Sequence, residues 1–167
     1  MNALKEQTEM LDPNNWDRVR NQLMVWIGDN HAVDWMMNYL SIVEFFDDII
    51  DDDKEIPEQV AFNCMHDALI HFPSNPFFQK HYPVLVPQIM LGMRNYSLAN
   101  KLEKRGTDDD LIFSYVMRCF LDITMTVIEL TRGMEYADAI ELEVHDWSMN
   151  NPQSSMEKYS EYQKEHT

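Results

Sequence analysis

The chain has 167 residues and a formal net charge of −16, and 45% of its residues are hydrophobic, which is too many for a disordered acidic tail. The charge repels nucleic-acid phosphates and anionic membranes, so we expect neither as a partner. Four glycines against 13 methionines favour helices over a β-sandwich.

A helical period persists through the chain, with no sustained strand alternation. The sequence predicts helices, in chain order, from 14 or 15 to 27, from 31 to 52, from 57 to 72, from between Pro83 and Pro87 to 105, and from 109 to 147. Asn30 is the predicted cap of the second helix, and Gly133 is predicted to kink the last. We therefore expect one all-α domain over 1–167, a bundle of about five to seven helices with 1–12 and 153–167 frayed.

Two features of the sequence predict a cytoplasmic location. Cys64 and Cys119 are far apart in the chain, which suggests a reducing compartment rather than a disulfide scaffold. The segment 1–12 is polar and acidic, unlike a signal peptide, and no uncharged apolar run reaches the ~18 residues of a membrane span.

Residues 44–53 contain six carboxylates in ten positions, namely Glu44, Asp47, Asp48, Asp51, Asp52 and Asp53. Like charges four apart on a helix repel by about 0.2–0.5 kcal/mol per pair. On a wheel of about 100° per residue, Glu44, Asp47 and Asp51 share a stripe with Leu40. An unpaired charge beside apolar side chains is costly, and a cation such as Mg²⁺ or Mn²⁺ would offset that cost. A solvated helix face that aids solubility is the alternative interpretation.

The stretch Phe46-Asp47-Asp48-Ile49-Ile50-Asp51-Asp52 resembles the aspartate-rich DDxxD element of the class I isoprenoid synthases, the prenyltransferases and terpene cyclases. The resemblance implies an all-helical bundle in which this element lies at the mouth of an apolar cavity. It implies Asp47 and Asp51 as Mg²⁺ ligands, with Asp48 as support, and an ion that holds the diphosphate of a prenyl substrate. Glu44, which shares their stripe on the wheel, is a further candidate ligand.

A polar stripe on the predicted 109–147 helix offers further candidates: Tyr115, Arg118, Asp122, Thr126 and Glu129. In the functional interpretation, Arg118 is the catalytic residue that neutralises diphosphate charge, and Asp122 or Glu129 holds a second metal ion. In the structural alternative, the stripe is a solvated face with an Arg118–Asp122 ion pair.

The leading hypothesis is therefore a Mg²⁺-dependent, diphosphate-binding, isoprenoid-synthase-like protein. A second possibility is a non-catalytic helical interaction protein, as a homodimer. A third is a metal-dependent phosphohydrolase, because His31, His66-Asp67 and Asp122 resemble in order the metal ligands of HD-type phosphohydrolases. The acid-rich helices also resemble those of all-α nucleotide pyrophosphohydrolases.

Overall fold

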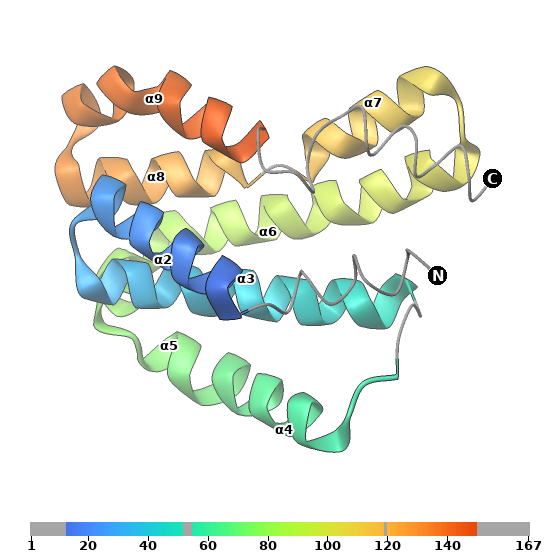
Figure 1. Ribbon diagram of the computed structural model, residues 1–167, viewed down its shortest axis with the longest axis horizontal. Helices are drawn as coiled ribbons and strands as arrows, with labels where there is room; N and C mark the ends of the chain where they lie inside the picture. The colour runs from blue at the N-terminus through green and yellow to red at the C-terminus, as the bar shows by residue number, and fades with distance from the viewer. Residues whose placement is uncertain (1–12, 52–54, 119, 150–167) are drawn as a thin grey trace. The chain divides into compact units, whose positions relative to one another are not determined.

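The computed structural model describes residues 13–51, 55–118 and 120–149, except for the side chains of 13–15, 51 and 149. No strand occurs in these ranges, which confirms the all-α fold class. The elements, shown in Figure 1, are α2 (Pro13–Ile27), α3 (Asn30–Asp51), α4 (Glu58–His66), the π-helix η1 (Asp67–His71), α5 (Phe72–Ser74), α6 (Pro76–Arg105), α7 (Asp108–Met117), α8 (Leu121–Arg132) and α9 (Met134–Met149).

The contacts divide the chain into two compact units, Met1–His81 and Tyr82–Thr167, with the boundary inside α6. The single domain over 1–167 stays a prediction. The segments predicted to fray, 1–12 and 153–167, lie outside the described residues.

In the first unit, side chains fix the helix ends. Gly28 takes the left-handed conformation, with φ of +68°, and ends α2. The next helix is capped by Asp29 rather than by the predicted Asn30, because the Asp29 carboxylate accepts the Ala32 amide at 2.8 Å. Asn75 caps α6, because its side-chain oxygen accepts a hydrogen bond from the Phe77 backbone N–H at 2.9 Å. The side-chain nitrogen of Asn75 donates a hydrogen bond to the His31 carbonyl, also at 2.9 Å. Asn75 thus ties the start of α6 to the start of α3.

Trp35 of α3 is the centre of the aromatic core in the first unit. It is fully buried and stacks on Tyr39 and Phe78, with ring centroids 5.7 and 5.8 Å away. Phe72 of α5 lies 5.3 Å from it at a tilted angle. Such pairs add about 0.5–1.5 kcal/mol each beyond burial. The core therefore anchors one face of α3 against the α5–α6 turn.

Two predictions about the later helices were wrong. The helix α6 begins at Pro76, where Asn75 caps it, and runs on through Pro83 and Pro87 rather than starting between them. The predicted helix over 109–147 is three helices. One helix ends at Met117 and the next begins at Leu121, and Gly133, where a kink was predicted, separates the second from the third. The helices α8 and α9 on either side of Gly133 pack against each other, burying Val127, Ile128, Ala137 and Val144.

The connection from α6 to α7 is held by a compact polar network around Asp110. Gly106, with φ of +75°, ends α6, and Thr107 caps α7 by accepting the Asp110 amide. The buried Asp110 carboxylate accepts hydrogen bonds from Arg105 Nε at 2.6 Å and from the Thr107 hydroxyl at 2.6 Å. These bonds, Arg105 first and then Thr107, hold the pKa of Asp110 far below its ordinary value.

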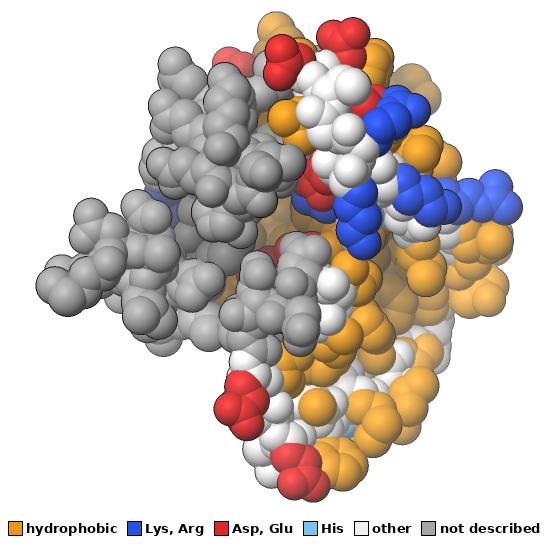
Figure 2. Space-filling model, turned by 90° about the vertical axis from the view of Figure 1, so that its right-hand side faces the viewer, with side chains coloured by type: hydrophobic (Ala, Val, Ile, Leu, Met, Phe, Trp, Pro, Cys, Tyr) orange, Lys and Arg blue, Asp and Glu red, His pale blue; other side chains and the backbone are white. Residues whose placement is uncertain are grey.

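Apolar side chains are also exposed on the surface, as Figure 2 shows for the face that it presents. Residues Asp108–Arg132 are, among the described residues, the one stretch long and apolar enough to cross a membrane, by length and composition alone. Core helices of soluble proteins satisfy the same criterion. In the structure the stretch forms α7 and α8.

The Asp110 network gives a prediction about pH. Asp110→Asn should lower the free energy of unfolding at pH 7, because the neutral amide loses the ion pair with Arg105 and has one acceptor oxygen in place of two. Because the pKa of Asp110 is depressed in the folded state, its ionised carboxylate adds its full share to the free energy of unfolding above pH 3.8, the ordinary pKa. That share is lost as the pH falls below this value and the carboxylate is protonated. Urea unfolding from pH 7 to pH 2 should show the gap between wild type and variant narrowing below about pH 4. The control is Asp109→Asn at the exposed neighbouring position. If it lowers the free energy of unfolding as much as Asp110→Asn does, this account is contradicted.

Candidate metal centre

One group of metal-ligating side chains in the described part of the chain is compact enough to share an ion, and it consists of His66, Asp67 and His71. Their ligand atoms all lie within 4.8 Å of one another. The Nδ1 atom of His71 donates to the Asp67 carboxylate at 2.8 Å, and His66 Nδ1 lies 3.8 Å from the same oxygen. The two imidazole rings meet edge to face, with centroids 4.6 Å apart.

A π-helical turn brings these side chains together. On an α-helix, residues five apart such as His66 and His71 point about 140° away from each other. In η1 the Phe72 amide bonds back to the Asp67 carbonyl, an i→i+5 step that stacks residues five apart. Pro73, which follows, has no N–H to continue the ordinary α-helical pattern. The π turn therefore converts an unfavourable spacing into a cluster.

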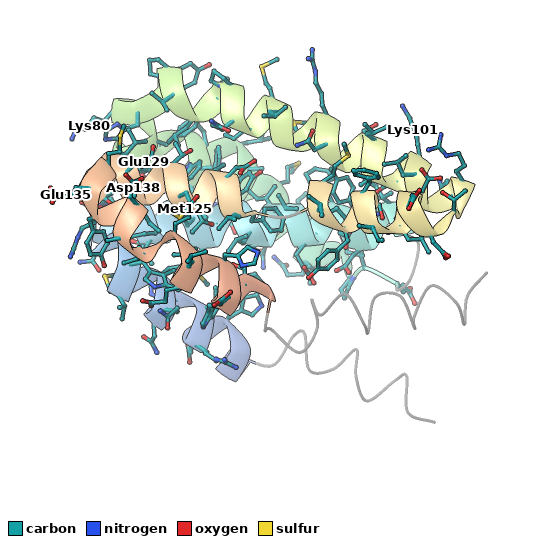
Figure 3. All side chains as sticks on the ribbon, turned by 90° about the horizontal axis from the view of Figure 1, so that it is seen from above. Lys80, Lys101, Met125, Glu129, Glu135 and Asp138 are labelled. Carbon is teal, nitrogen blue, oxygen red and sulfur yellow. The ribbon has the colours of Figure 1, made fainter. Side chains whose placement is uncertain are left out.

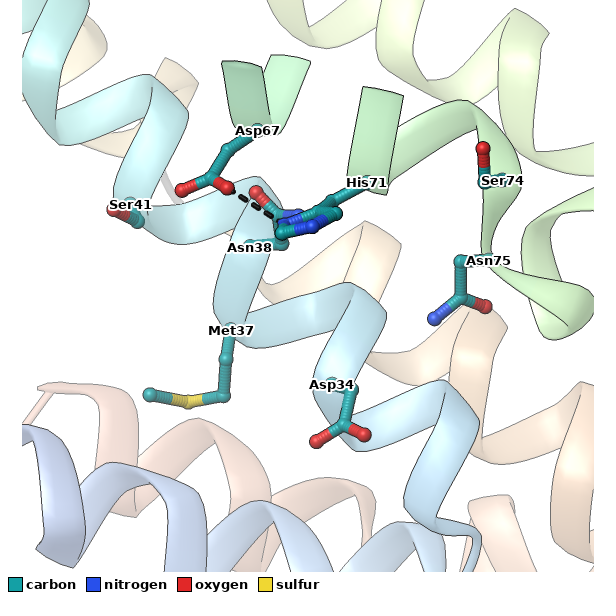
Figure 4. Close-up of a pocket in the computed structure, with 8 residues that line it drawn as sticks. All are labelled: Asp34, Met37, Asn38, Ser41, Asp67, His71, Ser74 and Asn75. Carbon is teal, nitrogen blue, oxygen red and sulfur yellow. Dashed lines mark hydrogen bonds and ion pairs between the residues drawn. The ribbon is translucent and has the colours of Figure 1, made fainter. Parts of the chain in front are cut away.

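Two residues of the cluster, Asp67 and His71, line a groove between this segment and α3, which Figure 4 shows. The groove has a volume of about 560 Å³. Its wall on α3 consists of four residues at i, i+3, i+4 and i+7 steps, which share one helix face: Asp34, Met37, Asn38 and Ser41. The facing wall consists of Asp67, His71, Ser74 and Asn75. Asp34 is paired with Arg20 of α2 at 2.5 Å.

The chemistry of the cluster suits a divalent transition-metal ion. Imidazole nitrogen and carboxylate oxygen bind Zn²⁺ at about 2.0–2.2 Å, so ligand atoms of one ion lie at most about 4.4 Å apart. A bound ion would draw these side chains slightly closer than they stand. The side chains of His66 and His71 are 57% and 61% exposed, so they are open to that adjustment and to solvent. An ion held here would keep coordination positions for water or a ligand.

Cys64 lies one turn before Asp67 and is partly buried. Burial raises the pKa of its thiol, and the negative charge of Asp67 raises it further. Cys64 is not part of the group that could share an ion, so the ligand atoms of the cluster are nitrogen and oxygen.

The acids predicted to bind Mg²⁺ lie on the second half of α3. Glu44, Asp47 and Asp48 are partly buried, and none of the three is without an interaction partner. Asp51 is the last residue of α3, and its side chain lies outside the described residues. The apolar neighbours Phe46, Ile49 and Ile50 are about half exposed. On this part of the helix, acids and apolar side chains share the surface.

The predicted catalytic residue Arg118 is engaged within the second unit. Its guanidinium donates to Glu103 at 2.7 Å and to Asn100 Oδ1 at 2.6 Å, and it stands over the Tyr96 ring at 5.2 Å. The side chains of Arg118 and Glu103 are only 22% and 14% exposed. The pair locks the end of α7 to α6, so the positive charge of Arg118 is already balanced by a carboxylate.

Asp122 and Glu129, the candidates for a second metal ion, are both exposed on α8. The Thr126 hydroxyl between them donates to the Asp122 carbonyl at 2.8 Å rather than to a side chain. Figure 3 labels Glu129 on α8 and Asp138 on α9. His31, the first ligand expected from the HD-type pattern, is not part of the His66–Asp67–His71 group, and Asp122 belongs to the second unit.

Two residues of the site were missed in the sequence. His71 has no metal-ligand spacing to His66 on an α-helical wheel, and only the π turn supplies one. Asn38 lies on the face of α3 that lines the groove, and its side-chain oxygen is closed to solvent without a hydrogen-bond partner. A signal was nevertheless present, because Asp34, Asn38 and Ser41 form a polar strip along α3.

Compared with family models, curated proteins and solved structures, the chain matches none of them.

The Arg118–Glu103 pair gives a second prediction. Arg118→Met should lower the free energy of unfolding by about 3 kcal/mol, because it leaves the Glu103 carboxylate mostly buried and unpaired. Adding Glu103→Gln should restore most of the loss, which chemical denaturation would measure. The control is Arg94→Met at an exposed position of α6. A free energy of unfolding equal to that of the wild type in Arg118→Met would contradict a structural role for the Arg118–Glu103 pair.

Proposed function

We propose that the protein binds a divalent transition-metal ion at His66, Asp67 and His71 and presents it to a small ligand in the adjoining groove. The observation that carries this proposal is the convergence of three ligand atoms within 4.8 Å on one turn of helix. The groove supports it, because Asp67 and His71 of the cluster line a space of about 560 Å³ that also contains the side chains of Ser41 and Ser74.

The charges of the site favour an anionic ligand. The groove has two carboxylates, and Asp34 is balanced by Arg20. A divalent ion on Asp67 and two neutral imidazoles leaves one net positive charge, in a chain whose overall charge is −16. Among the classes that the sequence left open, this arrangement favours the metal-dependent phosphohydrolase. The ion would supply a Lewis acid and an activated water, while Ser41 and Ser74 offer hydroxyl groups to phosphate oxygens.

The first test is thermal unfolding with Zn²⁺, Mn²⁺ or Co²⁺. At 100 times its dissociation constant, an ion that binds only the folded state adds about 2.7 kcal/mol. For a chain of this size, that corresponds to a rise of roughly 5–10 °C in Tm. His71→Ala should abolish the rise.

The matched control is His145→Ala. His145 also lies beside a carboxylate, with its Nδ1 3.2 Å from Asp146, but it belongs to no three-residue group in the described chain. This variant should keep the full rise. An unchanged response in His71→Ala would contradict the proposal. Hydrolysis of phosphate esters and nucleotides by the metal-loaded protein then tests the reaction class.

The second candidate function is the Mg²⁺-dependent, diphosphate-binding, isoprenoid-synthase-like one. Its support is the partly buried position of Glu44, Asp47 and Asp48 on a long apolar helix. The engagement of Arg118 with Glu103 means that in this scheme the ion itself must balance most of the diphosphate charge.

The two functions separate by ion and by variant. If the second is correct, Mg²⁺ with a prenyl diphosphate should raise Tm in wild type and not in Asp47→Asn/Asp48→Asn, whereas His71→Ala should leave that rise intact. If neither ion acts, the non-catalytic interaction protein is favoured, and sedimentation would test the proposed homodimer.

A further inference from the structure

We infer that Asn38 of α3 is a fourth ligand of the metal site, so that a bound ion joins α3 to η1 through the Asn38 side-chain oxygen. This inference rests on the proposed function, because it names a further residue of the same site.

The primary observation is an amide oxygen without a partner. Asn38 Oδ1 is closed to solvent and has no hydrogen-bond partner, although buried side-chain oxygens nearly always have one. A leucine or methionine at this position of α3 would avoid that cost. The presence of an amide is therefore explained best by a group that uses its oxygen.

The second observation is where that oxygen lies. Asn38 shares the groove with Asp67 and His71, and in Figure 4 its amide points toward their hydrogen-bonded pair. The two walls belong to segments in contact, α3 and η1. The other polar groove residues of α3 do not share this feature. Asp34 is paired with Arg20, and Ser41 is exposed to solvent.

The chemistry of an amide oxygen fits the other ligands. It is neutral, so it completes the coordination shell without cancelling the single positive charge that attracts an anion. Together with two imidazoles and one carboxylate it makes a set of two nitrogens and two oxygens. Such a set suits Mn²⁺, Fe²⁺, Co²⁺ or Zn²⁺ rather than a thiolate-seeking ion. A six-coordinate ion held by four protein ligands keeps room for water and substrate.

The test uses Co²⁺ and Zn²⁺ alone as probes, with titration calorimetry for affinity and the visible spectrum of Co²⁺ for the ligand shell. Asn38→Leu should weaken binding by about tenfold or more and change the Co²⁺ spectrum. Its Tm without metal should be unchanged or higher, because the variant removes an unpaired buried oxygen. The control is Asn95→Leu, the same change at a partly buried asparagine of α6 outside the groove, which should bind both ions with wild-type affinity and spectrum.

Asn38→Asp keeps an oxygen at the position and should bind at least as tightly as wild type. This variant also decides the matter if Asn38→Leu does not fold. Wild-type affinity and spectrum in Asn38→Leu, or loss of binding in Asn38→Asp, would overturn the role of Asn38 while leaving the three-residue site intact. Failure of the wild type to bind Co²⁺ or Zn²⁺ would instead overturn the proposed function and this inference together.

Discussion

The hydrogen bond from the Phe72 amide to the Asp67 carbonyl determines which side chains face the groove of the first unit. Its i→i+5 step replaces one turn of α-helix with a π turn, and it places His66 and His71 on the same side as Asp67. A regular α-helix through this segment would separate the two imidazoles and leave Asp67 with one histidine partner. The metal proposal therefore depends on a local backbone feature, which the packing of Phe72 against Trp35 holds in place.

Arginine in this chain serves mainly as a structural partner. Arg20 pairs with Asp34, Arg105 with Asp110, and Arg118 with Glu103, each joining neighbouring helices or capping one. With 29 acidic and 13 basic residues, the chain as a whole repels an anion. A divalent ion concentrates positive charge at one point without opening any of these pairs. In both proposed functions, a bound ion would therefore supply the positive charge that an acidic chain lacks.

The sequence was sufficient for the fold class and for most helix ends, because hydrophobic period and glycine position act locally. Gly28 and Gly106 end helices where left-handed backbone is needed. Two helix ends were missed. The start of α6 was placed too late, because the local cap by Asn75 begins this helix at Pro76, ahead of Pro83 and Pro87. The end of α7 at Met117 was missed, because the helical pattern of the sequence continues past it. The metal-binding role of Glu44, Asp47 and Asp48 stays a prediction. The partner of Arg118 could not be predicted from a local pattern, because it is Glu103, 15 positions away in the chain.

An anomalous-difference map of crystals grown with Co²⁺ tests the central claim most directly. The account predicts a peak about 2.1 Å from nitrogen atoms of His66 and His71 and from an Asp67 oxygen, on the groove side of η1. A peak at Asp47 and Asp48 instead, or no peak at the histidine pair in crystals with Co²⁺ in excess, would contradict it.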